Sequence, residues 1–117
     1  MSLRWKPELS HAFGQGTGGT TVVVSAVARA RVAIYRLIVT NNQAAAATLV
    51  IQDTTGVALS QTFQLGITPA MVLDLADNQD PWWVTNPGVG VQLVQGTGTN
   101  TIAWDIYYLQ QVMPYAG

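Results

Sequence analysis

The sequence predicts an all-β protein: a single antiparallel β-sandwich, jelly-roll-like, of about eight strands. Three observations support this fold class. Turn signals recur at short intervals from Thr20 onward, the segments between them are rich in β-branched and aromatic residues, and no segment has a convincing helical period. Eight short strands in a domain of roughly 100 residues fit two packed sheets, with a small barrel as the alternative.

The N-terminal half supplies the first three expected strands. Thr20–Val27 is rich in threonine and valine and follows a glycine-rich stretch. Arg31–Thr40 is the strongest strand prediction, and the pair Asn41-Asn42 after it indicates a turn. Ala46–Asp53 comes next, because the alanines at 44–47 are too few to nucleate a helix.

The C-terminal half supplies five more. After a turn at Thr54-Thr55-Gly56, apolar and polar residues alternate cleanly from Val57 to Leu65, which indicates a half-buried strand. The last segment alternates as well, with Ile102, Trp104, Ile106 and Tyr108 on one face. The five expected strands are Val57–Leu65, Met71–Leu75, Trp82–Thr85, Val89–Gln95 and Thr101–Gln111.

The chain divides into an extended N-terminal arm, residues 1–19, and a β-sandwich domain, residues 20–117. The arm ends in Gly14, Gly16, Gly18 and Gly19, which disfavour a regular element. It also carries Trp5, Leu9 and Phe13, and a free tail rarely holds so much apolar surface. We expect these side chains to dock on a neighbouring subunit; the alternative is that they fold back onto their own domain.

Charged residues are scarce. The chain has five basic and six acidic side chains in 117 residues, whereas a typical domain of this length has roughly 29 charged residues. A surface with so little charge and a net charge of −1 does not repel its neighbours. We therefore expect the protein to work packed against copies of itself or a partner.

The strand Arg31–Thr40 supports the same expectation. In regular alternation, Val32, Ile34 and Ile38 oppose Ala33, Tyr35, Leu37 and Val39, so both faces are largely apolar. Only one face of a sandwich strand meets the core, and the other would need a cover. This pattern predicts a homo-oligomer, with a trimer as the expected form, and it makes Tyr35 and Arg36 candidate interface residues.

The composition also argues against several function classes. There is no cysteine, the single histidine is His11, and the single lysine is Lys6, so an enzyme, a cofactor and a metal site are not expected. Among the cations only Arg29, Arg31 and Arg36 lie close together, which is too few for a nucleic-acid or membrane-surface interface.

One acidic and aromatic segment has three interpretations. Asp74, Asp77 and Asp80 precede Trp82 and Trp83. The favoured interpretation is a loop whose aspartates bond to their own backbone; a cation site or a sugar site are the alternatives. Adjacent strand residues face opposite sides, so one tryptophan should enter the core and the other should point outward, and the same applies to Tyr107 and Tyr108.

Several segments together resemble small all-β structural proteins of tailed bacteriophages, which include head decoration (cement) proteins and minor tail or fibre-associated modules. The similarity covers about residues 30–111 and rests on an alanine-rich strand–turn–strand texture. The resemblance implies a jelly-roll-like, trimeric subunit that reinforces a virion, and it brings no catalytic residues with it. The segments that carry it are 35–47 (YRLIVTNNQAAAA), 48–53 (TLVIQD), 62–65 (TFQL) and 80–83 (DPWW).

Two functions follow as expectations. The first is a non-enzymatic virion protein that decorates or cements the capsid, with itself and the major capsid protein or another virion protein as partners. The second is a phage tail or fibre-associated, or lectin-like, module that recognises a cell-surface glycan through Trp82 or Trp83. The residues expected at a partner interface are Trp5, Leu9, Phe13, Tyr35, Arg36, Trp82 and Trp83.

Overall fold

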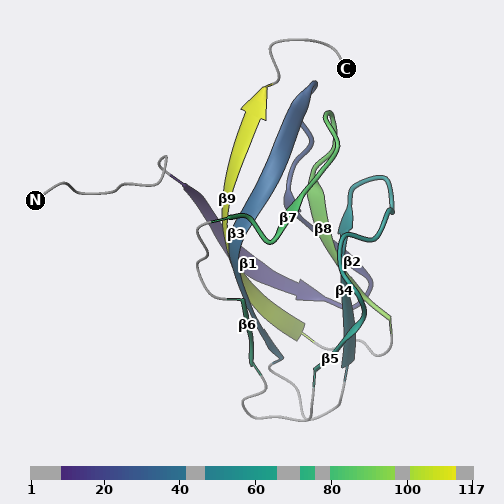
Figure 1. The fold of residues 1–117 in the computed structure, drawn as a ribbon. Coiled ribbons are helices and arrows are strands. Elements are labelled where there is room, and N and C mark those ends of the chain that lie inside the picture. Colours follow the sequence, from purple (N-terminus) through teal and green to yellow (C-terminus); the bar gives the residue numbers. More distant parts are fainter. Residues whose placement is uncertain (1–8, 42–46, 66–71, 76–79, 97–100, 113–117) are drawn as a thin grey trace, which may run out of the picture.

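A computed structural model describes residues 9–41, 47–65, 72–75, 80–96 and 101–112. They form two antiparallel sheets packed face to face, so the predicted all-β sandwich is confirmed (Figure 1). No helix long and apolar enough to span a membrane occurs in this part of the chain. The strands are β1 (Ser10–Thr17), β2 (Thr20–Val24), β3 (Ala30–Asn41), β4 (Ala47–Asp53), β5 (Phe63–Leu65), β6 (Val72–Leu75), β7 (Trp83–Val84), β8 (Val91–Gln95) and β9 (Thr101–Val112).

The strand order is that of a jelly roll. The first sheet, called sheet A here, has the order β1-β9-β3-β6, with the short β7 also paired to β3. The second, sheet B, has the order β2-β8-β4-β5. Early and late strands thus lie side by side in both sheets, with β9 between β1 and β3 and with β8 between β2 and β4. Such long-range pairing joins the two halves of the chain into one core.

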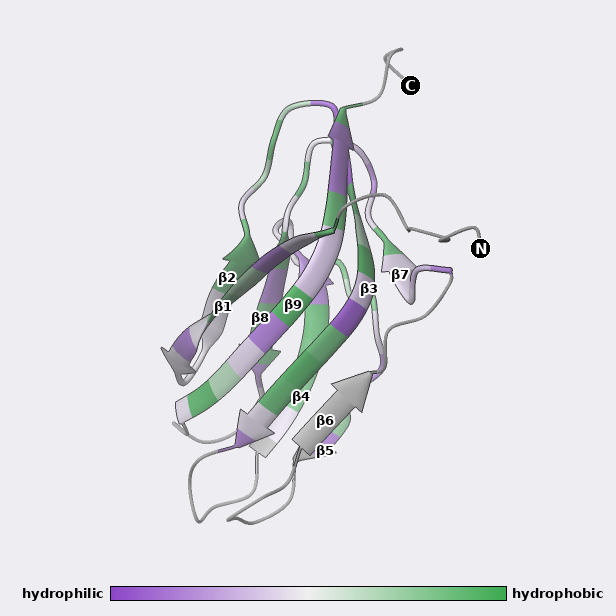
Figure 2. Ribbon diagram, turned by 90° about the vertical axis from the view of Figure 1, so that its left-hand side faces the viewer, coloured by the Kyte–Doolittle hydropathy of each residue, from purple (hydrophilic) through white to green (hydrophobic). Residues whose placement is uncertain are grey.

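The core lies between the sheets and is aliphatic apart from Trp104. Val32, Ile34, Leu37 and Val39 of β3 are fully buried in it. Figure 2 shows hydrophobic residues interspersed with hydrophilic ones along β9. The remaining members of the core cluster are Val23, Val24, Leu49, Ile51, Val91, Leu93, Ile102, Trp104 and Ile106.

The expected N-terminal arm is wrong from residue 10 onward, because this segment forms strand β1. Residues 10–17 pair with β9 of the same chain in one uninterrupted antiparallel register, so the sandwich begins by residue 10 and not at residue 20. Gly14 allows Trp104 to pack closely on β1, because a Cβ at this position would lie 2.9 Å from Cζ2 of Trp104. Gly18 and Gly19 have positive φ and make the turn into β2. Trp5 and the rest of residues 1–8 lie outside the described residues.

The expected strand Val57–Leu65 is wrong over most of its length, because only Phe63–Leu65 is a strand. Gly56 turns the chain with a φ of 96°, and the amides of Leu59 and Ser60 both donate to the carbonyl of Ile51. These bonds fold residues 57–62 back along β4, and Val57 remains 59 % exposed. The predicted turn at Thr54-Thr55-Gly56 is present, but alternation in the sequence did not predict that regular strand pairing resumes only at Phe63.

A β-bulge explains why β3 seemed apolar on both faces. Its register against β9 shifts between Ile34, opposite Tyr108, and Arg36, opposite Tyr107, so Tyr35 is the extra residue. Because of this insertion, Val32 and Ile34 before the bulge face the same core as Leu37 and Val39 after it. The assignment of Leu37 and Val39 to the opposite face is wrong, and the two-faced pattern does not by itself require a covering subunit.

Candidate binding face

The outer face of sheet A brings together side chains from three strands that are distant in sequence. His11 of β1 lies opposite Tyr107 of β9, which lies opposite Arg36 of β3. In the next row, Phe13 lies opposite Asp105, and Asp105 opposite Ile38. These rows form because the side chains of paired residues emerge on the same side of a sheet.

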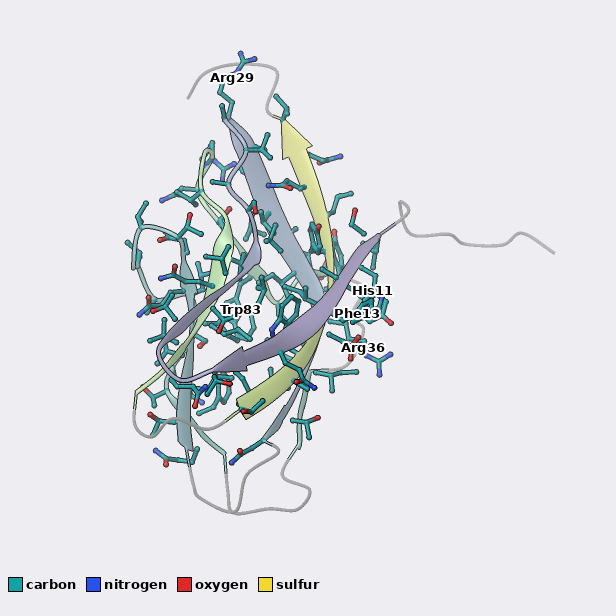
Figure 3. The ribbon with its side chains drawn as sticks, turned by 180° about the vertical axis from the view of Figure 1, so that it is seen from behind. His11, Phe13, Arg29, Arg36 and Trp83 are labelled. Carbon is teal, nitrogen blue, oxygen red and sulfur yellow. The ribbon has the colours of Figure 1, made fainter. Side chains whose placement is uncertain are left out.

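Three rings form a stacked group, called the aromatic cluster: Phe13, His11 and Tyr107. The centroids of His11 and Tyr107 are 4.3 Å apart with an interplanar angle of 10°. Those of His11 and Phe13 are 5.6 Å apart at 29°. Figure 3 shows His11 and Phe13 side by side, with Arg36 beside them. The guanidinium carbon of Arg36 lies 5.8 Å from the centroid of the Tyr107 ring.

A contact between a histidine and a carboxylate adjoins the aromatic cluster. Nε2 of His11 lies 2.8 Å from Oδ1 of Asp105, and both side chains are partly exposed, at 36 % and 45 %. A pair so exposed contributes at most about 1 kcal/mol to stability. Its clearer effect is geometric, because it fixes the imidazole on one side while Tyr107 holds the ring by stacking.

Phe13 is the most exposed large hydrophobic residue in the described part of the chain, at 73 %. Its ring projects from β1 at the edge of sheet A, where it gains little from its own subunit. Leaving a phenylalanine in water forgoes roughly 2 kcal/mol of burial free energy. A phenylalanine so placed is typical of a contact surface, in which aromatic residues are enriched.

The predicted interface residues do not converge on one site. Phe13 and Arg36 lie on the outer face of sheet A, and Leu9, half-buried, lies just before β1. Tyr35 occupies the bulge of β3 and is half-buried. Trp82 and Trp83 lie at the opposite edge of sheet A from Phe13, because β7 pairs with β3 on the side away from β9.

The two tryptophans differ in burial, as predicted. Trp83 packs against the core, whereas Trp82 is 41 % exposed. Their ring centroids lie 6.3 Å apart. The tyrosines divide in the same manner, with Tyr108 against the core and Tyr107 in the aromatic cluster.

The acidic loop stays largely a prediction. Asp77 lies outside the described residues. Asp74 belongs to β6, but its side chain is not described, whereas Asp80 is exposed. The described residues contain no group of three or more histidine and acidic side chains placed to hold a metal ion.

Sequence reasoning missed His11, Asp105 and Tyr107 as a group. It placed His11 in a glycine-rich arm, where nothing would hold the imidazole, and the structure instead fixes the ring between two aromatic residues and a carboxylate. The alternation of His11 with Phe13 and of Asp105 with Tyr107 marks an outward face on each strand. The pairing of β1 with β9, between residues 84 to 98 positions apart in the sequence, has no local signal.

The outer face of sheet B differs in its chemistry. Its central side chains on β8 and β4 are amides, hydroxyls and valines, and Nε2 of Gln92 donates to Oε1 of Gln52 at 3.0 Å. No charged residue of β2, β4, β5 or β8 lies on this face, since Asp53, the one charged residue in these strands, is buried. The charged and aromatic groups of the sandwich faces are therefore concentrated on sheet A.

No protein-family model matches this chain, and no curated protein matches it. The jelly roll and the chemistry of the sheet A face are the features that bear on its function.

Proposed function

We propose that this protein is a non-enzymatic structural subunit that works by packing against copies of itself and a larger assembly. The resemblance to phage decoration and cement proteins makes a virion, and its major capsid protein or another virion protein, the proposed setting. The observation that carries the proposal is the outer face of sheet A, where an exposed phenylalanine continues a stacked aromatic cluster.

The fold and the charge pattern support this function. Jelly rolls are common in viral capsid proteins, although the fold also occurs in lectins and does not decide function alone. A surface with few charges lets subunits approach without like-charge repulsion. The trimer implied by the resemblance belongs to this proposal.

Glycan recognition is the second candidate, favoured by the exposed rings of Trp82 and Phe13. Sugar rings stack on exposed aromatic faces. In the aromatic cluster, His11 and Tyr107 stack on each other at 4.3 Å, so each covers a face that a sugar would need. This arrangement favours assembly over glycan binding at the cluster and leaves Trp82 as the better glycan candidate.

The test is sedimentation of the full chain together with Tyr107→Ser, which removes the middle of the outer face. We expect the wild-type chain to form a discrete oligomer at tens of micromolar and Tyr107→Ser to shift it toward monomer. Val57→Ser is the matched control, because Val57 is also exposed but lies in the loop after β4. A monomeric wild-type chain that binds a glycan array through Trp82 would replace this proposal with the second candidate.

A further inference from the structure

The edge of sheet A at β1 lacks the protection found at the other sheet edges. β1 runs for eight residues against β9 without a register shift. Its sequence, SHAFGQGT, contains no proline, lysine, arginine or acidic residue. Soluble proteins normally shield an edge strand by shortness, a bulge, a proline or a charge, because bare edge amides and carbonyls pair with another chain.

The remaining edges among the described strands are all shielded by shortness or irregularity. β2 has five residues and a register shift between Val22 and Val24. β5, β6 and β7 have three, four and two residues. Within the described chain, no strand pairs with the side of β1 opposite β9.

We infer that β1 pairs antiparallel with β1 of a second copy, joining two A sheets across a two-fold axis at Phe13. The inference rests on the proposed assembly function, but it replaces the trimer implied by the resemblance with a two-fold contact, which cannot by itself relate three copies. An edge-to-edge contact between identical strands is self-complementary, so it closes as a dimer. Further contacts would be needed to build any larger assembly from such dimers.

The outward residues of β1 restrict the register, and an aromatic pair of the two Phe13 rings distinguishes one of the registers that remain. Outward residues must meet outward residues, since a slip by one position turns every side chain to the other face. With the axis at Phe13, the two Phe13 rings lie opposite each other and His11 of one copy faces Gln15 of the other. Aromatic cross-strand pairs are stabilising, and no like charges are opposed. The most exposed ring of the described chain is thereby covered.

The core-facing side of β1 is compatible with a close approach. Ala12, Gly14 and Gly16 face inward, and Trp104 lies directly over Gly14. The seam therefore adds no bulky side chain to either core. Pairing extends the outer face of sheet A across both subunits and places the two aromatic clusters next to each other.

The absence of cysteine allows a direct test by cross-linking. In this register two Phe13→Cys residues lie opposite each other, with Cα atoms about 4.5–5.5 Å apart, within the range of a disulfide. Two Gln15→Cys residues would be offset by four positions, or about 13 Å, and could not bond. We expect rapid disulfide dimers for Phe13→Cys under mild oxidation and none for Gln15→Cys or for Val57→Cys.

A second variant tests the contact without a bond. Phe13→Lys places two ammonium groups opposite each other at the axis and should shift the sedimenting species to monomer, with an unchanged far-ultraviolet spectrum because Phe13 is exposed in the subunit. Val57→Lys should sediment as wild type.

Equal cross-linking at positions 13 and 15, or an oligomer unaffected by Phe13→Lys, would overturn the inference. An intact trimer without cross-links at position 13 would overturn the β1 seam while leaving the proposed assembly function in place. A wild-type chain that is only monomeric would contradict both.

Discussion

Arg29 has a backbone conformation that L-residues adopt at a cost. Its φ is 63°, in the turn between β2 and β3, where the amide of Ala30 donates to the carbonyl of Val27 at 3.0 Å. Figure 3 shows its side chain projecting from the end of the sandwich. The left-handed region costs a non-glycine residue about 1–2 kcal/mol.

Arg29→Gly should therefore stabilise the fold by about 0.5–1 kcal/mol, since relief of the left-handed conformation exceeds the entropy that glycine adds to the unfolded chain. Urea denaturation measures the change. Ala28→Gly, next to it in the same turn but without a positive φ, should instead lower the unfolding free energy. A less stable Arg29→Gly variant would show that the arginine side chain contributes more than its backbone strain costs.

Asp53 organises the turn after β4. Its Oδ1 accepts hydrogen bonds from Oγ1 of Thr55 at 2.6 Å and from the amides of Thr55 and Val57 at 2.9 and 3.1 Å. Burial acts to raise the pKa of this carboxyl, but the hydrogen bonds from Thr55, Val57 and Gly56 outweigh it and lower the pKa below its ordinary value of 3.8. The folded state thus favours the ionised form.

Because the folded pKa is lowered, Asp53 contributes stability that is fully present above its unfolded pKa of about 3.8 and is lost as the pH falls through the lower folded value. Asp53→Asn keeps an acceptor oxygen but cannot titrate. We expect the melting temperature of this variant to fall less steeply than that of wild type below about pH 4. Asp80→Asn, at an exposed position, is the control and should follow the wild-type acid profile; identical profiles for all three proteins would refute the role of Asp53.

At the scale of the element, the bulge at Tyr35 decides how β3 meets the core. Without it, Leu37 and Val39 would face away from Val32 and Ile34, all four of which are fully buried. Deleting Tyr35 restores regular alternation and leaves the same residues facing inward. Deleting Ile38 would instead place Arg36 in the core or turn Val39 outward.

Deletion of Tyr35 should therefore preserve the fold at a cost of about 1–2 kcal/mol, whereas deletion of Ile38 should abolish cooperative unfolding. Thermal melts followed by near-ultraviolet circular dichroism distinguish these outcomes. If the Tyr35 deletion unfolds while the Ile38 deletion remains folded, the bulge does not determine which residues of β3 face the core.

At the scale of the whole molecule, we expect Trp83 to support the stability of the subunit and Trp82 to belong to its exposed surface. Trp83→Ala should cost about 3 kcal/mol, as truncation of large core-packed aromatics does. Trp82→Ala should change stability by less than about 1 kcal/mol, because its ring is 41 % exposed. Chemical denaturation of the two variants provides the comparison, and similar losses for both would show that the exposed ring also supports the fold.

The local pattern of residues was sufficient to predict the β-sandwich and the positions of most strands. β-branched segments bounded by glycine, proline and asparagine placed β2, β3, β4, β6, β7, β8 and β9 close to their observed ends. Alternation also separated the exposed Trp82 from the core-packed Trp83 correctly, although Trp82 lies just outside β7. It separated Tyr107 from Tyr108 because strand geometry fixes which way neighbouring residues of β9 point. The scarcity of charge, and the expectation of assembly drawn from it, came from composition alone.

Tertiary structure decided the rest. Whether Ser10–Thr17 is an arm or a strand depends on a partner 84 to 98 residues away in the sequence. Strand β9 is that partner, and its Trp104 packs on Gly14. The phase of β3 depends on a bulge that opposes Tyr107 and Tyr108, and a bulge leaves no reliable mark in one strand's own sequence. The aromatic cluster exists only because β1, β9 and β3 lie in that order and register. Local residue types determined which segments are strands, whereas long-range pairing determined which side chains meet.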